Sequence, residues 1–147
     1  MSILKILLLL LITLCFTAPT LSAQDSPYDA EPLDPADAFV LDHLVTAPSE
    51  VVIRWQIPRF YYLYKEKIVF SSKDFIIEKI DLPAAAKKED PFFGSSEVFY
   101  DVLEATIRLT PIIKGQSKGI LDVAYQGCWE GGICYPLQKN SLKLSGL

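Results

Sequence analysis

In Val51-Val52-Ile53-Arg54-Trp55-Gln56-Ile57, apolar residues occupy every second position of a short segment. Successive side chains of an extended chain point to opposite sides, so Trp55 and the apolar residues two positions away share one face. Arg54 and Gln56 share the other face. This pattern is typical of a β-strand with one buried face.

The same alternation recurs along the chain, at residues 103–110, 121–125 and 142–144. Aromatic and β-branched residues, which suit pleated sheets, fill three further runs, at residues 61–64, 68–70 and 75–80. Together these runs predict about seven or eight strands. Because the sequence shows no amphipathic helical stretch beside them, we expect an all-β fold in which two antiparallel sheets pack as a sandwich.

One segment does not fit this pattern. Residues 84–90 are small or polar and disfavour strands, and they lead directly into Phe92 and Phe93. We expect a loop here, and connecting loops lie on the surface. Two adjacent phenylalanines in a surface loop would expose much apolar area, so we expect them to pack over another part of the protein.

The first residues have the pattern of an export signal. Lys5 gives a positive start, residues 6–16 are almost wholly apolar, and Leu21-Ser22-Ala23 is a small-residue cleavage site. The apolar run is shorter than the roughly 20 residues that a membrane-spanning helix needs. We therefore expect a signal peptide at residues 1–23, cleaved after Ala23, and an exported mature protein.

Removal of 23 residues leaves 124 of the 147, which suffices for one hydrophobic core. Residues 24–36 contain three prolines that disfavour regular structure, and we expect an extended arm there, followed by the domain at residues 37–147. Asp37–Leu44 fits either a short helical turn or an extended edge. The mature chain has 13 basic and 18 acidic residues, a formal charge of −5, which argues against nucleic-acid binding.

Cleavage also removes Cys15, so the mature protein has two cysteines, Cys128 and Cys134, in a compartment where disulfides persist. Lipidation of Cys15 is the alternative fate of the leader, but Leu14 is bulkier than that processing normally accepts. Closing a ring of about seven residues stabilises a fold by only about 2.4 kcal/mol, against about 4.7 kcal/mol for a ring of about 100. Spacing alone therefore indicates a modest structural disulfide.

The neighbours of the pair favour a redox role. Gly127, Gly131 and Gly132 would let the backbone accommodate both the bonded and the open form and let a partner approach the sulfurs, while Trp129 and Tyr135 add apolar surroundings. Thiol exchange depends on access and on the thiolate fraction.

The sequence shows no activating base beside the pair. The nearest one is Lys139, five positions beyond Cys134, so we expect specific protein partners rather than free thiols as reactants. A metal site is disfavoured, because five residues separate the cysteines and His43 is the one histidine of the chain. We interpret His43 as a surface or packing residue, and we expect no cofactor.

Several motifs resemble those of the N-terminal periplasmic domain of the thiol:disulfide interchange protein DsbD, a transmembrane electron transporter. The residues that carry the resemblance are Pro35-Ala36-Asp37-Ala38-Phe39, Trp55-Gln56-Ile57, Tyr61-Tyr62-Leu63-Tyr64-Lys65, Phe93-Gly94-Ser95-Ser96-Glu97-Val98, Tyr125-Gln126-Gly127-Cys128 and Cys134-Tyr135-Pro136. The last two motifs, with five residues between the cysteines, are the most specific.

The resemblance implies an immunoglobulin-like sandwich in which a cap loop shields a redox-active Cys128–Cys134 pair. Phe92 takes the place of the shielding aromatic residue. Asp90, Tyr62 and Tyr64 fall where the family places groups around the pair, and Phe93 and Trp129 complete the expected surroundings. The alternatives are a solvated loop residue at Asp90 and core or sheet packing for the two tyrosines. A mobile cap would protect the pair and lift when a partner docks.

The resemblance also implies the exchange partners. A membrane electron-transfer domain would supply reductant to this chain. We expect this chain to be a monomer. Thioredoxin-like periplasmic proteins, such as a disulfide isomerase or a cytochrome c maturation factor, would receive it. Cys134 would form the mixed disulfide and Cys128 would resolve it.

The chain departs from the family at three places. Pro91 stands where an acidic residue is common, Phe60 where glycine often precedes the tyrosines, and Leu137 where a second proline often follows Pro136. The sequence also ends at Leu147 without membrane helices, which fits either a fragment of a transporter or a free-standing domain.

Two other functions remain open at this stage. The first is an exported binding or assembly module whose disulfide is purely structural. The second is a copper chaperone.

Overall fold

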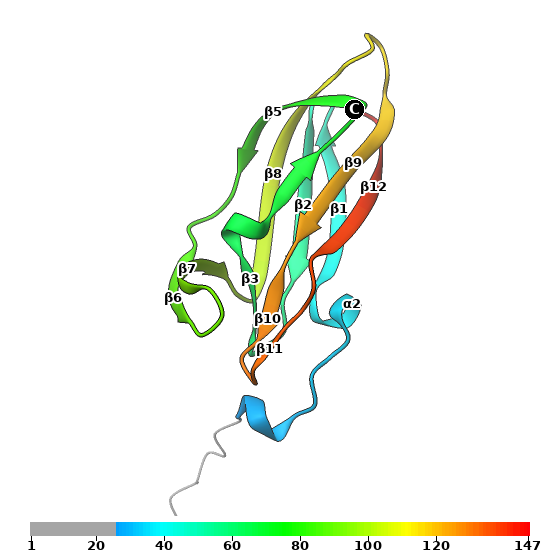
Figure 1. Ribbon diagram of the computed structural model, residues 1–147. Helices are drawn as coiled ribbons and strands as arrows, with labels where there is room; N and C mark the ends of the chain where they lie inside the picture. Colours follow the sequence, from blue (N-terminus) through cyan, green and yellow to red (C-terminus); the bar gives the residue numbers. More distant parts are fainter. Residues whose placement is uncertain (1–25) are drawn as a thin grey trace, which may run out of the picture.

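The computed structural model describes residues 26–147, which form strands arranged in three hydrogen-bonded sheets (Figure 1). The first sheet has the order β1-β2-β8-β5 and comprises Val40–Ala47, Glu50–Gln56, Val102–Pro111 and Phe75–Asp81. The second has the order β11-β10-β3-β7-β6 and comprises Ile133–Cys134, Gly127–Trp129, Tyr61–Tyr64, Gly94–Phe99 and Ala86–Asp90. The third has the order β12-β9-β4 and comprises Gln138–Ser145, Lys118–Tyr125 and Val69–Ser71.

The second and third sheets lie end to end and together face the first sheet (Figure 1). Three chain segments run from one into the other: β9 leads into β10, β11 into β12, and β3 into β4 through the 3-10 turn η3 (Lys65–Lys67). All the strand pairings are antiparallel. The predicted all-β antiparallel fold is confirmed.

The core lies between these layers and follows the predicted alternation. On β2, Val51, Ile53 and Trp55 are fully buried, whereas Arg54 and Gln56 are exposed. The other strands that face the core bury their apolar positions in the same way, at Leu103, Ala105, Ile107 and Leu109 of β8 and at Leu121, Val123 and Tyr125 of β9.

Residues 84–90 contradict the expected loop. Ala86–Asp90 forms β6, which pairs with β7 over five residues and builds a hairpin that projects beside β3 (Figure 1). The strand is polar because it lies at the edge of its sheet, where one side faces water and charged side chains are favoured. The predicted number of strands was also too low, since the described residues contain twelve, several of them only two to four residues long.

The start of the chain combines both alternatives considered for Asp37–Leu44. A short helix, α2 (Pro35–Ala38), is followed directly by β1. Pro27 and Pro35 do not block regular structure but begin η2 (Pro27–Asp29) and α2, because proline suits the first position of a helical turn. The signal peptide, its cleavage site and Cys15 lie outside the described residues.

Within residues 26–147, no helix has both the length and the apolar character needed to cross a bilayer.

Candidate functional site

The β10–β11 hairpin places the two cysteines directly opposite each other. Cys128 pairs with Cys134 in register, their Cα atoms lie 4.0 Å apart, and a disulfide joins their sulfurs. The amide of Tyr135 donates to the carbonyl of Gly127 at 3.0 Å, which makes the cysteines a closely spaced pair between ladder hydrogen bonds. Cys128 is completely buried, whereas Cys134 is partly exposed. A partner can therefore reach Cys134 more easily than Cys128.

Two tyrosines of β3 line the pair on the side away from the main core. The Tyr64 hydroxyl lies 3.1 Å from Sγ of Cys128 and 3.7 Å from Sγ of Cys134. Tyr62 lies two positions before Tyr64, so both rings point to the same face, and they meet edge to face at 5.4 Å. With Val98 and Cys128 they form a small apolar cluster separate from the sandwich core. The predicted positions of both tyrosines around the cysteines agree with this geometry.

Asp90 organises the turn at the tip of the β6–β7 hairpin. The Tyr62 hydroxyl donates to one carboxylate oxygen of Asp90, and the amides of Phe92 and Phe93 donate to the other at 2.8 and 3.0 Å. Burial alone would raise the pKa of Asp90, but these hydrogen bonds, first of all that from Tyr62, outweigh it and lower the pKa. Asp90 is thus a buried carboxylate that ties the turn to β3.

Both tyrosines remain protonated near neutral pH. Burial raises the pKa of Tyr62, and its hydrogen bond to Asp90 raises it further. Burial is also the largest reason why the pKa of Tyr64 is raised. The Tyr64 hydroxyl can therefore donate a hydrogen bond to a sulfur, and a neutral donor next to a thiolate stabilises the charged form.

The two phenylalanines of the cap occupy different surroundings. The ring of Phe93 meets that of Tyr64 edge to face at 4.9 Å, and the ammonium of Lys67 lies 5.0 Å from its centroid. Phe92 is 49% exposed and Phe93 42% exposed. Through Tyr64, Phe93 is linked to the sulfurs, whereas the shielding role of Phe92 stays a prediction.

Two of the three glycines around the cysteines lie where a side chain would clash. A Cβ at Gly127 would overlap the carbonyl oxygen of Tyr62, and one at Gly131 would overlap the indole of Trp129. These two positions need glycine for close packing, and the role expected for all three glycines in opening of the disulfide stays a prediction. Gly132 has φ +100°, a conformation that favours glycine.

Trp129 belongs to the sandwich core as well as to the hairpin. It is 7% exposed and its ring stacks on that of Tyr61 at 6.5 Å. Trp129 thereby packs the β10–β11 hairpin against the sandwich core, on the face opposite to the one lined by Tyr62 and Tyr64.

Two residues at the site were missed by the sequence analysis. Lys88 of β6 forms an ion pair with Glu130, in the turn between the cysteines, at 3.0 Å, and its ammonium also lies 4.6 Å from the ring centroid of Tyr62. The pair is 42 positions apart, so sequence spacing gives no signal for it. Glu130 itself, a charged residue inside a glycine-rich turn, could have been noticed. The ring of His43, on β1, contacts the carbonyl of Lys143 at 3.3 Å. Its interpretation as a surface or packing residue stays a prediction.

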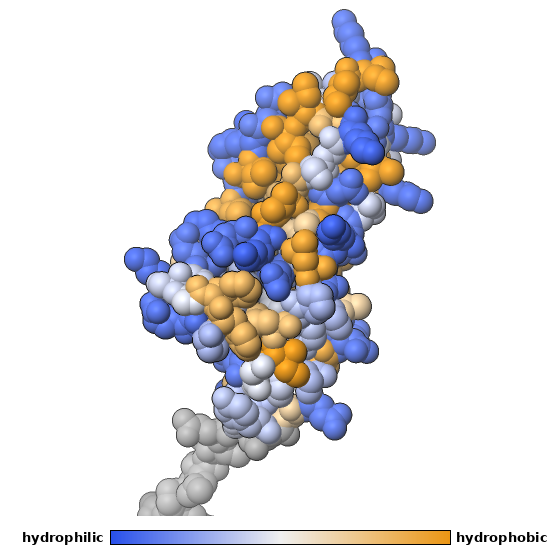
Figure 2. Space-filling view, viewed as in Figure 1, coloured by the Kyte–Doolittle hydropathy of each residue, from blue (hydrophilic) through white to orange (hydrophobic). Residues whose placement is uncertain are grey.

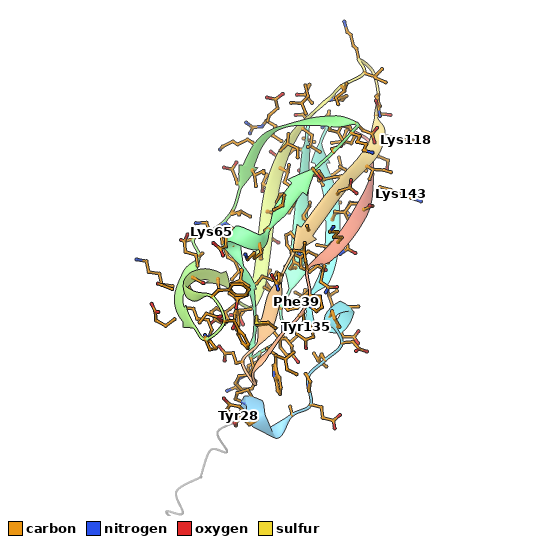
Figure 3. All side chains as sticks on the ribbon, viewed as in Figure 1. Tyr28, Phe39, Lys65, Lys118, Tyr135 and Lys143 are labelled. Atoms are coloured by element: carbon orange, nitrogen blue, oxygen red, sulfur yellow. A yellow bond between two sulfur atoms is a disulfide. The ribbon has the colours of Figure 1, made fainter. Side chains whose placement is uncertain are left out.

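The N-terminal arm is tied to the same end of the molecule. The amide of Leu33 donates to the Tyr61 hydroxyl at 2.7 Å, and the Tyr135 hydroxyl donates to the carbonyl of Leu33 at 2.6 Å. Figure 3 shows Tyr135 beside Phe39 at this end, where their rings meet edge to face at 5.6 Å. The arm therefore packs against the residue that follows Cys134.

The backbone conformation of Phe60 shows why glycine is common at this position in the family. It has φ +71°, in the left-handed region, where glycine is normally preferred. Its carbonyl accepts a hydrogen bond from the amide of Glu130 at 2.8 Å, so this conformation also holds the turn between the cysteines.

Comparison with known proteins gives consistent matches. The family model described as thiol:disulfide interchange protein DsbD, N-terminal, matches residues 29–146. The protein of that name from Klebsiella pneumoniae is 33% identical over 138 residues, which cover 94% of this chain and 22% of the relative. The one from Escherichia coli K12 is 30% identical over 136 residues, covering 92% of this chain and 23% of the relative. The chain thus spans less than a quarter of the length of these relatives.

Two solved structures from Neisseria meningitidis have the same fold. The DsbD N-terminal domain in the reduced form superposes with a TM-score of 0.65 at 31% identity, covering 83% of this chain and 94% of that one. The complex between the DsbD N-terminal and PilB N-terminal domains matches with a TM-score of 0.60 at 29% identity, covering 78% and 88%. The predicted immunoglobulin-like sandwich is confirmed, and the chain belongs to the family of DsbD N-terminal domains.

Proposed function

We propose that this chain is a periplasmic thiol:disulfide exchange domain that passes reductant to other proteins through reversible opening of Cys128–Cys134. The observation that carries the proposal is the position of the pair, in a short hairpin at the end of the sandwich, with Cys134 partly exposed and a tyrosine hydroxyl at both sulfurs. Membership of the DsbD N-terminal family supports it.

In the proposed reaction, the dithiol form reduces the disulfide of a partner. The thiolate of Cys134 attacks one partner sulfur, a mixed disulfide forms, and the second partner cysteine leaves as a thiolate. The thiolate of Cys128 then attacks Sγ of Cys134, which restores the Cys128–Cys134 bond and releases the first partner sulfur as a thiolate. Two electrons pass to the partner, whose two thiolates take up protons according to their pKa values.

Cys134 is proposed as the attacking residue and Cys128 as the resolving residue, because Cys128 is completely buried. Tyr64 is proposed to stabilise the thiolate, since its hydroxyl lies within reach of both sulfurs and remains protonated. Asp90, Phe92 and Phe93 are proposed to form the cap, and Tyr62 of β3 is proposed to hold it through its hydrogen bond to Asp90.

The surface around the pair suits a protein partner. Figure 2 shows an apolar patch over the β6–β7 and β10–β11 hairpins, where Phe92, Phe93 and Ile133 are at least 40% exposed. Exposed apolar patches of this kind mark protein interfaces. The related domain from N. meningitidis was solved in complex with the PilB N-terminal domain.

We propose thioredoxin-like periplasmic proteins as acceptors, among them a disulfide isomerase or a cytochrome c maturation factor, and a membrane electron-transfer domain as donor. We also propose that residues 1–23 are cleaved on export. The mature protein would then consist of an arm at residues 24–36 and the domain at residues 37–147.

A trapping experiment tests the exchange. In Cys128→Ala the mixed disulfide cannot be resolved, so we expect a covalent complex between Cys134 and a thioredoxin-like partner that dithiothreitol dissolves. Cys134→Ala is the matched control and should trap little. Absence of a complex, together with a reduction potential below about −300 mV, would instead assign the bond as a structural staple, because structural disulfides resist reduction to that degree.

A further inference from the structure

The β6–β7 hairpin is held to the rest of the domain by few backbone contacts. Strand β7 pairs with β3 at only two positions, Leu63 with Phe99 and Tyr64 with Val98, and β6 pairs with β7 alone. The outer part of the hairpin, which carries the proposed cap, therefore depends on side-chain contacts for its position beside Tyr62 and Tyr64.

One of these contacts reaches the turn between the two cysteines. Nζ of Lys88, on β6, lies 3.0 Å from Oε1 of Glu130, and the Tyr100 hydroxyl donates to the same oxygen at 3.4 Å. The Lys88 ammonium also faces the ring of Tyr62, the residue that binds Asp90. Glu130 is itself held by the hydrogen bond from its amide to the carbonyl of Phe60.

This ion pair is less exposed than the ion pair between Lys65 and Glu97. The side chains of Lys88 and Glu130 are 20% and 30% exposed, whereas Lys65 and Glu97, which join β7 to η3, are 39% and 52% exposed. Water screens a partly buried pair less than an exposed one, so the Lys88–Glu130 pair holds its geometry more strongly.

We infer that Lys88 and Glu130 form a latch that holds the cap hairpin against the cysteine hairpin and slows access to the Cys128–Cys134 bond. The latch rests on the proposed exchange function, since it controls access to the same two sulfurs. Lys88 and Glu130 are positioning residues, because neither carries out the exchange. A partner or reductant that reaches Cys134 by lifting the cap has to separate them.

The latch is tested by the rate at which dithiothreitol reduces the disulfide. One thiolate of the reagent attacks Sγ of Cys134, and the Cys128 thiolate leaves. The second thiolate of the reagent then attacks the reagent sulfur of this mixed disulfide, which closes the ring disulfide of the reagent and releases Cys134 as a thiolate. We expect Lys88→Met and Glu130→Gln each to raise this rate about 3- to 10-fold, and the double variant to raise it no further than the stronger single one. Lys88→Arg keeps the charge and should remain within about twofold of the wild type.

Three further measurements separate a latch from a general loss of structure. The charge-reversed double variant, Lys88→Glu with Glu130→Lys, restores an ion pair at this place. Its rate of reduction by dithiothreitol should therefore lie closer to that of the wild type than the rates of Lys88→Met and Glu130→Gln do. The reduction potential should stay unchanged, since a latch alters access in both directions of the reaction. Raising the salt concentration should accelerate the wild type but not Lys88→Met.

Lys65→Met with Glu97→Gln is the matched control, because that pair also anchors the cap hairpin but does not touch the cysteine turn; Figure 3 marks Lys65. Its rate should stay within about twofold of the wild type. Equal acceleration in this control, or unchanged rates in Lys88→Met and Glu130→Gln, would overturn the latch. Either result would leave the exchange function intact, since that function is judged by trapping of a partner at Cys134.

Discussion

A single carboxylate, Asp90, joins the cap turn to the strand that lines the cysteines. It accepts hydrogen bonds from the Tyr62 hydroxyl and from the amides of Phe92 and Phe93. Hydrogen bonds to a buried charged group contribute about 1.5–3 kcal/mol each. Asparagine keeps one carbonyl oxygen but has an NH2 group in place of the other oxygen, so either the Tyr62 hydroxyl or the two amides lose their acceptor. We expect Asp90→Asn to lower the free energy of unfolding by about 1–3 kcal/mol in urea titrations at neutral pH.

The same residue predicts a pH dependence. The pKa of Asp90 is lower in the folded than in the unfolded protein, so its contribution to stability is complete above its unfolded pKa and is lost as the pH falls through the folded value. The difference in stability between wild type and Asp90→Asn should therefore shrink on acidification below about pH 4. A difference that stays constant down to pH 2 would contradict the charged state assigned to Asp90.

Tyr64 is expected to act on the chemistry rather than on the fold. Tyr64→Phe removes the hydroxyl beside both sulfurs, so the thiolate loses a donor and its pKa rises. We expect the reduced variant to react about 3- to 10-fold more slowly with a small disulfide at neutral pH, as followed by stopped-flow absorbance. Tyr125→Phe, which removes another buried hydroxyl, bound by Asn140, serves as control and should react at the wild-type rate.

The left-handed conformation of Phe60 predicts an unusual order of stability. Such a backbone costs a residue with a Cβ about 1–2 kcal/mol, and a β-branched side chain fits it worst. Phe60→Val should therefore be less stable than Phe60→Gly, although valine retains more apolar surface. Thermal unfolding of the two variants measures this order, and a more stable valine variant would show that packing outweighs the backbone strain.

At the scale of elements, the turn of the β6–β7 hairpin carries two phenylalanines, Phe92 and Phe93, for which we expect different roles. Phe92→Ala should raise the rate at which small reductants attack the disulfide, because the family resemblance gives Phe92 the shielding position. Phe93→Ala should also raise it, because Phe93 packs on Tyr64. Stopped-flow measurement of the rate of disulfide reduction compares the two variants. An unchanged rate in Phe92→Ala would show that Phe92 does not shield the disulfide and would assign that role to Phe93.

The elements also show what the sequence could predict. Strands β2, β8 and β9 follow from alternation, because each has one face in the core. Strand β6 does not, since Lys87, Lys88 and Glu89 form a strand only through pairing with β7 at a sheet edge. The cysteines and Asp90 were found from motifs, whereas the contact between Lys88 and Glu130 depends on how two hairpins pack and leaves no local pattern.

At the scale of the whole molecule, the hairpin that carries Cys128 and Cys134 lies at one end of an elongated sandwich (Figure 1). The N-terminal arm meets that end through Leu33, which Tyr61 and Tyr135 hold by two hydrogen bonds. A chain that begins at Pro35 should fold but be less stable by about 1–2 kcal/mol, since each hydrogen bond contributes about 1 kcal/mol. Urea unfolding measures this loss, and an unchanged midpoint would show that the arm contributes nothing to the hairpin.

Strand β11 has only two residues and pairs with β10 alone. In the structure, the Cys128–Cys134 bond and two backbone pairings hold this edge in register. Reduction removes the covalent bond, so we expect this edge to open more often in the dithiol form. The hydrogen of the Tyr135 amide, bound to the Gly127 carbonyl, should then exchange with deuterium faster after reduction. One backbone proton would thus report the redox state of the domain without any added label.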